Sequence, residues 1–218
     1  METIQKDYAI NAEVILSNLN SDITLTTHSG KNVSISATGT KEDLKNLEIF
    51  EEDGVVNISS AGNNVINSDN SSITVYGNNN FIIQGSNSIV SNNNEKMKLI
   101  ISMPETSSLS IKNISGDVNC GSLKSYLQAK VSGCSRINVA SLEGNASLSA
   151  SGSGKIKIET GNIQRLTASA SGASKISVDV DVEVADLTAS GASKITIRSV
   201  VDLSKSKSGA AKIKIKNN

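Results

Sequence analysis

A short cassette of eight residues repeats along the second half of the chain at an almost fixed interval. "SGASKISV" at 171–178 returns as "SGASKITI" at 190–197, and looser copies begin at Ser132, Ser151 and Ser208. A degenerate, shorter copy, "SGDVNC", surrounds Gly116. A period this short largely decides the architecture, because each unit is too small to bury a core by itself. Steps of 19, 20, 19 and 18 residues separate the cassette glycines, which are Gly133, Gly152, Gly172, Gly191 and Gly209.

Two strands are predicted in every repeat. The positions four and six after each glycine hold Ile or Val, and the residue between them is polar in every copy. This alternation is typical of a strand with one buried face, and β-branched residues favour the extended backbone. A second alternating stretch precedes each cassette. It begins at a leucine, namely Leu127, Leu148, Leu166, Leu187 and Leu203.

A repeat of about 19 residues leaves no room for a helix beside two strands. We therefore predict an all-β fold, a parallel β-solenoid whose coils of 17–20 residues stack on one another. Gly and Ser at the corners supply the backbone conformations that a tight coil needs. Each further coil lengthens the rod by one strand spacing, about 4.8 Å.

Composition limits the core and the partners. Aromatic residues make up 2% of the chain and Trp is absent, so the core must be a thin stack of Ile, Val, Leu and Ala. The net charge of zero gives no global field that favours nucleic acid or membrane. Apolar runs are shorter than the roughly 18 residues of a transmembrane segment. The opening "METIQKDYAI" lacks a signal-peptide pattern, so we expect a cytoplasmic protein or a chain that begins after a removed signal.

We expect one solenoid domain over residues 1–218, in three zones that differ in sequence pattern and composition. Residues 1–60 hold N-terminal strands and a cap, with an Asp-Gly hairpin signal in "EEDGVV" and one helical turn in "KEDLKNL". Residues 61–94 are rich in Asn and form either coil corners and hairpin turns or a flexible polar insertion. Residues 95–218 form the regular solenoid and its C-terminal cap.

The C-terminal cap is predicted from two lysines. Lys205 and Lys207 take the positions that hold small or apolar inward residues in the preceding coils. An unpaired charge is not tolerated in a dry core. We therefore expect this strand to be splayed or to lie at an edge, with both ammonium groups in water.

The order of segments is similar to that of a bacterial family described as "putative auto-transporter adhesin, head GIN domain". The segments are "DITLTTHSGKNVSISA", the "EDGVVNI" hairpin, the "LIISMP" strand and the "SGSGKIKI" cassettes, and the resemblance covers nearly the whole chain. It implies a β-helical domain, usually exported to the periplasm or cell surface, with an adhesive role. It implies no catalytic residues and no cofactor.

The residues also argue against an enzyme. His28 is the single histidine and lies in a predicted loop, so we interpret it as a surface residue. "GSGK" at Gly152 lacks the spacing and the following helix of a phosphate loop. Two cysteines do not make a disulfide framework, and Cys120 and Cys134 are predicted to be small buried residues.

Acidic residues offer a weak candidate for metal binding. Alternation in "VDVDVEV" places Asp179, Asp181 and Glu183 on one outward face, where two carboxylates could bridge a Ca²⁺ ion or serve a hydrolase. The flanking coils supply no second acidic set. We prefer a solvated face in which Asp179 lies between Glu159 and Arg198 and forms a cross-strand ion pair.

A basic column is the sharper candidate site. Three residues after each glycine stand Arg136, Lys155, Lys175, Lys194 and Lys212. Stacking in register would align five cations about 4.8 Å apart. Each neighbouring pair would repel by roughly 0.9 kcal/mol in water and less in salt, a cost that a fold tolerates without a ligand. The column is therefore either a ladder that keeps a flat β-surface soluble or a stripe that binds a cell-surface glycan or another polyanion.

Three hypotheses remain for function. The first is a non-enzymatic structural or adhesive module, the second a module that binds an anionic glycan through the basic column, and the third a polysaccharide-active enzyme. Nucleic acid is a poor partner because no aromatic residue stands among these lysines to stack on bases. Residues 1–54 hold ten acids and four bases, whereas seven bases and one acid follow from Lys194 onward, so end-to-end association of copies is also possible.

Overall fold

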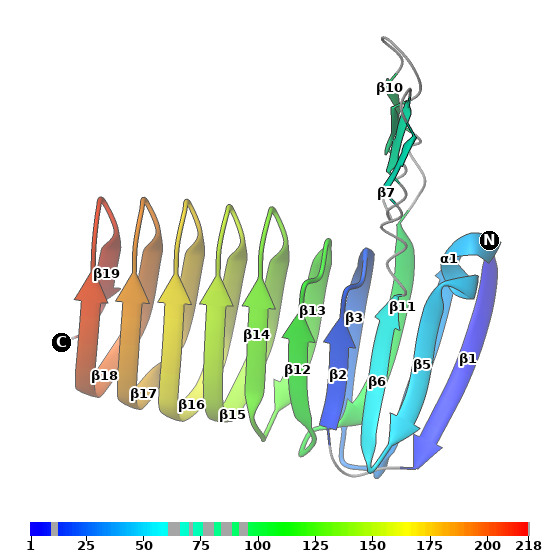
Figure 1. Cartoon of the computed structure of the whole chain (residues 1–218). Helices are drawn as coiled ribbons and strands as arrows, with labels where there is room; N and C mark the ends of the chain where they lie inside the picture. The colour runs from blue at the N-terminus through cyan, green and yellow to red at the C-terminus, as the bar shows by residue number, and fades with distance from the viewer. Residues whose placement is uncertain are drawn as a thin grey trace.

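The repeats form the stacked coils of a parallel β-solenoid, which confirms the predicted fold (Figure 1). This computed structural model describes residues 1–9, 13–60 and 96–217, together with four short strands between residues 66 and 91. Each coil crosses two walls of strands that face one another across a thin core. In the regular coils a sharp turn joins the walls at one end, and at the other end β15 to β18 bend without a break from one wall into the other. The coils therefore lie side by side along a rod.

The cassette wall is named for the repeated cassettes that supply most of it. Its parallel strands are β11 (Met97–Pro104), β3 (Ser21–His28), β13 (Asp117–Leu123), the first parts of β15 (Arg136–Ala150), β16 (Lys155–Ala170), β17 (Lys175–Ala189) and β18 (Lys194–Lys207), and β19 (Lys212–Ile215).

The leucine wall faces it. Its parallel strands are β6 (Val55–Ser60), β2 (Glu13–Ser17), β12 (Ser108–Lys112), β14 (Leu127–Val131) and the second parts of β15 to β18.

The core consists of aliphatic side chains that stack from one coil to the next. Ile156 is paired with Ile176, and Ile176 with Ile195, and none of the three is more than 1% exposed. The prediction that these residues stack inside one core is confirmed. Ala168 and Ala170 face them from the leucine wall and are equally buried, so the two walls can approach closely.

Glycine is required at the corner that precedes each cassette strand, which we call the glycine corner. Gly172 has a φ of 69°, and a Cβ atom placed there would lie 2.9 Å from the carbonyl oxygen of Gly152 in the coil below. Buried serines close the same turn, because Ser174 Oγ donates to the carbonyl of Ala150 at 2.9 Å and Ser193 Oγ to that of Ala170 at 3.0 Å. Only a glycine lets successive turns stack this tightly.

The opposite corner, which we call the far corner, absorbs the differences in coil length. Register shifts lie between Ile158 and Asn162 in the pairing of β16 with β17, and between Val178 and Asp181 in that of β17 with β18. The paired stretches on either side of these shifts keep their alignment. Coils of 18 to 20 residues therefore stack with both walls in register.

Antiparallel elements close the N-terminal end of the rod. β1 (Glu2–Ala9) pairs with β4 (Asn32–Gly39), β5 (Leu47–Glu52) pairs with β6, and α1 (Lys41–Lys45) joins β4 to β5. The helical turn and the Asp-Gly hairpin are both confirmed, the latter by φ values of 51° and 78° at Asp53 and Gly54.

Two side chains of β1 reach across this end. Lys6 Nζ and Tyr8 Oη donate to the carbonyl of Ile49 in β5, at 2.9 and 3.2 Å. These bonds tie β1, at the edge of the cassette wall, to the edge strand of the leucine wall. Tyr8 also packs against the core, so β1 covers the end at which an uncapped solenoid would expose its interior.

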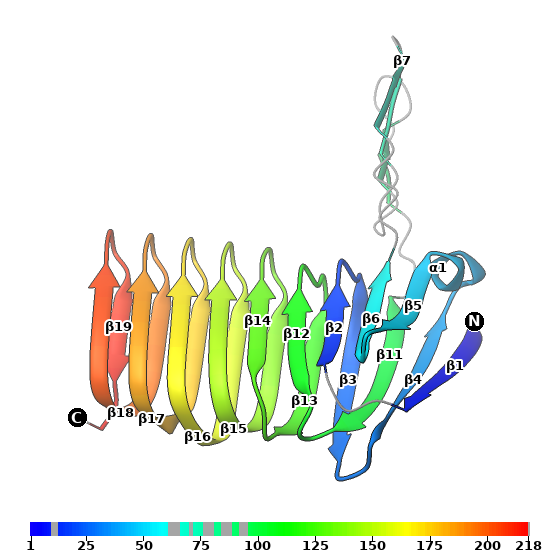
Figure 2. The same cartoon turned by 60° about the horizontal axis from the view of Figure 1, so that its bottom comes forward.

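The order of coils along the rod differs from their order in the sequence. β3 lies between β11 and β13, and β2 lies between β6 and β12 (Figure 2). The coil made by β2 and β3 is therefore inserted between two coils formed by later residues. The connection from β11 to β12 must pass it, and the amide of Glu105 in that connection donates to the carbonyl of His28 at 2.9 Å.

Four short strands belong to the Asn-rich segment. They form a second, antiparallel sheet in the order β10-β9-β8-β7. The rest of residues 61–94 lies outside the described residues, so the alternatives for this segment stay predictions. The bounds of the four strands are Ile66–Asp69 for β7, Ser72–Val75 for β8, Phe81–Ile83 for β9 and Ile89–Ser91 for β10.

The second part of β18 carries the two lysines of the predicted cap. Lys205 is aligned with Leu187 and Lys207 with Ala189, both of which are buried, yet both lysines are exposed. Among the described strands, this part of β18 is paired on one side only. The strand is thus edge-exposed rather than splayed, and the prediction that both ammonium groups reach water is confirmed.

Truncation of the core column tests the stacking energetically. We expect Ile176→Ala to lower the free energy of unfolding by about 2–5 kcal/mol. The substitution leaves a cavity in the core column, and the backbone pairing of the coils prevents them from closing around it. Ser169→Ala, which changes an exposed residue of the preceding strand β16, should shift the free energy of unfolding by under about 0.5 kcal/mol. Urea denaturation measures both. A shift below about 1 kcal/mol for Ile176→Ala would show that the column is not close-packed.

Candidate functional site

The basic column forms an exposed ladder on the cassette wall. Strand pairing aligns Arg136 with Lys155, Lys155 with Lys175, Lys175 with Lys194, and Lys194 with Lys212. All five residues are exposed. We refer to these five residues as the basic ladder.

The coil itself fixes the position of each ladder residue. Each is the first residue of its strand and follows the small buried residue that closes the glycine corner, as Lys175 follows Ser174. The next residue is an inward Ile, as Ile176 is, so alternation directs the ladder residue outward. The sequence thus places one cation per coil at the same point of every turn.

Carboxylates neutralise one end of the ladder and not the rest. Arg136 Nη1 lies 3.4 Å from Asp117 Oδ2 on the preceding strand. Among the ion pairs between described residues, none includes Lys155, Lys175, Lys194 or Lys212. Four adjacent coils therefore carry a cation without a carboxylate partner.

Other lysines of the solenoid, outside the ladder, do form ion pairs with carboxylates. Lys157, two residues after Lys155 on the same face, lies 2.7 Å from Glu159. A column at the far corner alternates in sign, because Lys124 Nζ lies 2.9 Å from Glu105 and the Glu143 carboxylate lies near enough to act on the same ammonium. The hydrogen bond to Glu105 and then the charge of Glu105 raise the pKa of Lys124, desolvation opposes them, and the charge of Glu143 adds the smallest effect, also upward.

The alternating column was missed in the sequence, although a signal for it is present. Glu105, Lys124 and Glu143 follow one another at intervals of 19 residues, the period of the cassettes. The column lies outside the cassette itself, where the residue types vary from coil to coil. A search for charges at the repeat period, rather than for repeated letters, would have found it.

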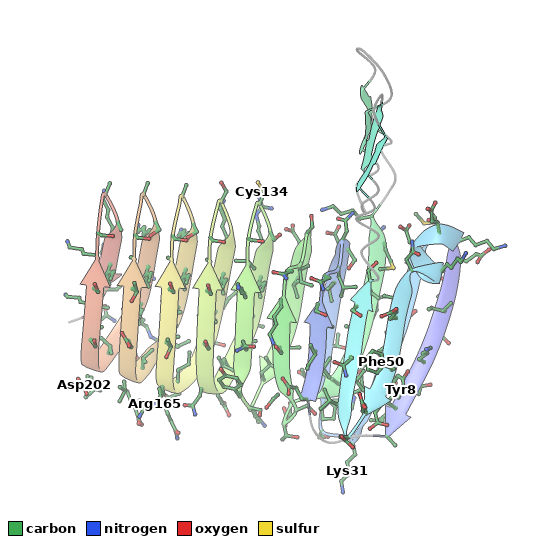
Figure 3. The ribbon with its side chains drawn as sticks, viewed as in Figure 1. Tyr8, Lys31, Phe50, Cys134, Arg165 and Asp202 are labelled. Atoms are coloured by element: carbon green, nitrogen blue, oxygen red, sulfur yellow. The ribbon has the colours of Figure 1, made fainter. Side chains whose placement is uncertain are left out.

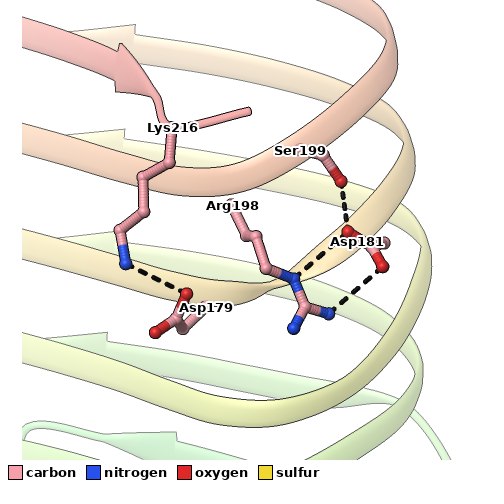
Figure 4. Close-up of polar contacts among 5 residues, drawn as sticks. All are labelled: Asp179, Asp181, Arg198, Ser199 and Lys216. Atoms are coloured by element: carbon pink, nitrogen blue, oxygen red, sulfur yellow. Dashed lines mark hydrogen bonds and ion pairs between the residues drawn. The ribbon is translucent and has the colours of Figure 1, made fainter. Parts of the chain in front are cut away.

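Two of the three acidic candidates, Asp179 and Asp181, are engaged in ion pairs at the far corner (Figure 4). Asp179 Oδ1 lies 3.0 Å from Lys216 Nζ, and Arg198 donates two hydrogen bonds to the Asp181 carboxylate, each at 3.2 Å. The expected pair between Asp179 and Arg198 is therefore wrong. Counting from the cassette glycines places Arg198 opposite Asp179. The register shift after Val178 instead aligns Asp181 with Ser199, so Arg198 lies within reach of Asp181.

The polar contacts of Asp181 also affect its ionisation. The hydroxyl of Ser199, first, and the guanidinium of Arg198 lower the pKa of this carboxyl, while desolvation opposes them. Glu183 is exposed. No group of three or more His, Cys, Asp or Glu side chains suited to a metal ion occurs among the residues that the structure describes.

Other polar features of the described chain are modest. His28 Nδ1 accepts a hydrogen bond from the amide of Gly30 at 2.9 Å, so this atom is occupied by its own loop. A shallow, open depression at the far corner is lined by Glu143, Gly144, Gly161, Asn162 and Gln164. No helix in the described parts of the chain has the length and apolar character needed to cross a membrane.

The two cysteines differ in environment. Cys120 is buried in the cassette wall as predicted, and desolvation raises the pKa of its thiol to about 12. Cys134 is exposed, so the prediction that it is buried is wrong (Figure 3). The residue that follows each cassette glycine lies at the tip of the glycine corner and points outward; its small size there reflects the tight turn rather than a core position.

Comparisons with known proteins identify a family and structurally similar chains. The model of the family described as "Putative auto-transporter adhesin, head GIN domain" matches residues 16–218. The crystal structure of a putative adhesin from Bacteroides fragilis is similar with a TM-score of 0.60 and 20% identity, over 98% of this chain and 96% of that one. A putative adhesin from Parabacteroides merdae has a TM-score of 0.42 and 13% identity, over 98% and 95% of the two chains. No curated protein matches the chain.

Removing the ladder should stabilise the fold at low salt. We expect the replacement of Lys155, Lys175 and Lys194 by Ser to raise the free energy of unfolding, by less than about 1 kcal/mol for each neighbouring pair removed. Urea denaturation at low salt and at about 0.5 M salt, where the Debye length is roughly 4 Å, measures the difference. The advantage of the variant should shrink in high salt. A variant that is less stable at both would show that these lysines pack structurally.

The environments of the cysteines predict selective thiol chemistry. At pH 8 we expect a thiol reagent to modify Cys134 in the folded protein and Cys120 only after unfolding, because the Cys120 thiol is buried and stays protonated far above this pH. Mass spectrometry before and after denaturation counts the labels. Cys134→Ser should leave the folded protein unlabelled, and rapid labelling of that variant would contradict the burial of Cys120.

Proposed function

From the premise that the chain belongs to the head GIN domain family of "putative auto-transporter adhesins", we propose that it is a non-enzymatic adhesive module of the bacterial cell envelope. The observation that carries this proposal is the solenoid itself, a stack of coils that are paired on both walls over its regular part. Such a rod presents an extended, rigid surface on which a partner can bind. The name of the structurally similar B. fragilis protein points in the same direction.

The arrangement of polar groups supports a role in binding rather than in catalysis. Asp179 and Asp181 are held in ion pairs with Lys216 and Arg198 and do not line the depression at the far corner. His28 is the last residue of β3, and three strands of the cassette wall lie between β3 and β17, which carries Asp179 and Asp181. A catalytic centre needs titratable groups that converge on a pocket, and the depression at the far corner contributes one carboxylate, that of Glu143.

Adhesion and location can be measured separately. Beads coated with the protein should be retained by cell-surface polysaccharide fractions, while beads coated with urea-unfolded protein should not. Protease treatment of intact cells, followed by antibody detection, reports whether the protein is accessible from outside. Retention of neither kind of bead, together with full protection from protease, would overturn the proposal.

A second candidate function is polyanion binding through the basic ladder. The observation that favours it is the in-register stack of Lys155, Lys175, Lys194 and Lys212, whose charges no carboxylate of the described chain neutralises. A polyanion laid over these side chains would remove the repulsion between them. The ladder is exposed along its length, so binding would require no rearrangement of the fold.

Charge-matched variants test this candidate. Replacing Lys155, Lys175 and Lys194 by Ser should greatly reduce retention on heparin resin, and a glycan-array signal should disappear in about 0.5 M salt. The matched control replaces Lys31, Lys112 and Lys130 by Ser, which removes the same charge from exposed positions outside the ladder. Equal retention of the two variants would show that net charge, and not the ladder, controls binding.

A further inference from the structure

We infer that the basic ladder binds a linear, non-aromatic polyanion with one negative charge per repeat, laid parallel to the axis of the solenoid. This inference rests on the proposed polyanion binding and specifies its ligand. The ligand chemistry is a chain of carboxylates or phosphates on a flexible backbone, as in acidic polysaccharides or in polymers of phosphodiesters. The geometry that points to it is the alignment of one cation per coil.

The spacing of the cations favours an extended polymer over a compact anion. Neighbouring coils are about 4.8 Å apart, so the four unpaired lysines cover a line of roughly 14 Å. A small anion can contact the ammonium groups of two adjacent coils at most. Only a chain with regularly spaced charges can engage Lys155, Lys175, Lys194 and Lys212 together.

The borders of the ladder carry little further unpaired positive charge as far as the coil of Lys194. On one side lie the tips of the glycine corners, where the exposed residues are no larger than Cys134 and include Ala173 and Ala192. On the other side, Ser177 and Thr196 are uncharged, and Lys157 is neutralised by Glu159. Lys214, beside Lys212 on the last strand, is exposed and adds a second cation at that end. A polymer can therefore approach over the small residues of the corner and, as far as the coil of Lys194, meet unpaired cations only along the ladder.

The ladder also has a defined beginning. Asp117 occupies the ladder position on the strand before Arg136 and forms an ion pair with it. Asp22, on the neighbouring strand β3, accepts a hydrogen bond from the amide of Asp117 and adds a second carboxylate there. Asp117 is paired with Arg136, and Asp22 lies 3.9 Å from Lys96 Nζ, so this end of the ladder carries no unpaired cation. The contacts of an anionic chain therefore start at Lys155 and extend away from the N-terminal end.

Stacking partners for nucleobases are absent from this surface. From β13 to β19, the described strands of the cassette wall contain no Phe, Tyr or Trp. Single-stranded nucleic acids gain much of their affinity by stacking bases on such rings. Two large apolar side chains that are exposed on strands of this wall lie away from the lysines: Ile100 is on β11, beyond the acidic start of the ladder, and Val201 is seven residues after Lys194 along β18. Neither stands beside the ladder of the described chain, where it could enter a lipid surface together with the lysines.

Oligomers of defined length test the inference. We expect the affinity for oligogalacturonates of about two to eight repeats to rise steeply until the chain covers the ladder, at four or five charges, and only slightly thereafter. Linear polyphosphates form a second arm that distinguishes carboxylate from phosphate chains. If each bound charge releases counterions as single strands do, the slope of log K against log salt should be about −3 for four contacts. Fluorescence anisotropy at low salt measures these affinities.

An interruption of the ladder supplies the sharpest variant. Lys175→Ser removes a middle cation, so we expect it to weaken binding of a pentamer about tenfold and of a dimer by under about threefold. Lys112→Ser, outside the ladder, should change neither affinity. Circular dichroism and thermal unfolding verify that each variant keeps the fold.

The failures of the two proposals are distinguishable. If no polyanion binds, or if the ladder variants bind as the native protein does, both the polyanion function and its linear ligand are wrong. If binding depends on the ladder but a compact anion such as inositol hexakisphosphate matches a linear hexamer, only the linear alignment is wrong. Tighter binding of an oligothymidylate of equal charge, or of vesicles with anionic lipid, would overturn the choice of a non-aromatic polymer.

Discussion

The alignment of each coil with the next is the constraint on which the rest of the structure depends. The glycine corners permit it, because at Gly172 any side chain would meet the backbone of the coil below within 3 Å. Once the corners stack, the strands that leave them are paired residue for residue, and identical positions of successive cassettes must coincide. One column of the core is then shared by Ile156, Ile176 and Ile195 as a consequence of the turn. Differences in coil length are accommodated at the far corner, where the register shifts lie.

The same alignment that buries the isoleucines also creates the exposed ladder. Lys175 and Ile176 are adjacent residues, so a register that superimposes the one column necessarily superimposes the other. The fold therefore tolerates the repulsion between lysines as a by-product of its core, and the size of that repulsion, roughly 0.9 kcal/mol per pair in water, is small beside the energy of a buried aliphatic side chain. What selects lysine at this position is thus not the stability of the coil, since a small polar residue would fit equally well.

The sequence predicts most of the features that the repeat determines and few of those that depart from it. Periodicity places the core column, the ladder and the exposure of Lys205 and Lys207, because each depends only on counting from a glycine. It misplaces Arg198, whose position depends on a register shift at the far corner, and it buries Cys134, whose orientation depends on the geometry of the turn. The insertion of β2 and β3 between later coils has no periodic signal at all, since residues 1–60 carry no copy of the cassette.

This insertion changes how the two ends of the rod are related. Coils made only of consecutive residues could form one after another from either end, as in a one-dimensional stack. Here β3 is paired with β11 on one side and with β13 on the other, so residues near 25, 100 and 120 come together in one part of the stack. The cassette coils, in contrast, are paired with coils that are neighbours in the sequence. The N-terminal strands are therefore an integral part of the stack as well as its cap, and the contacts between residues far apart in the sequence, which are the slow ones to form, are concentrated at the N-terminal end.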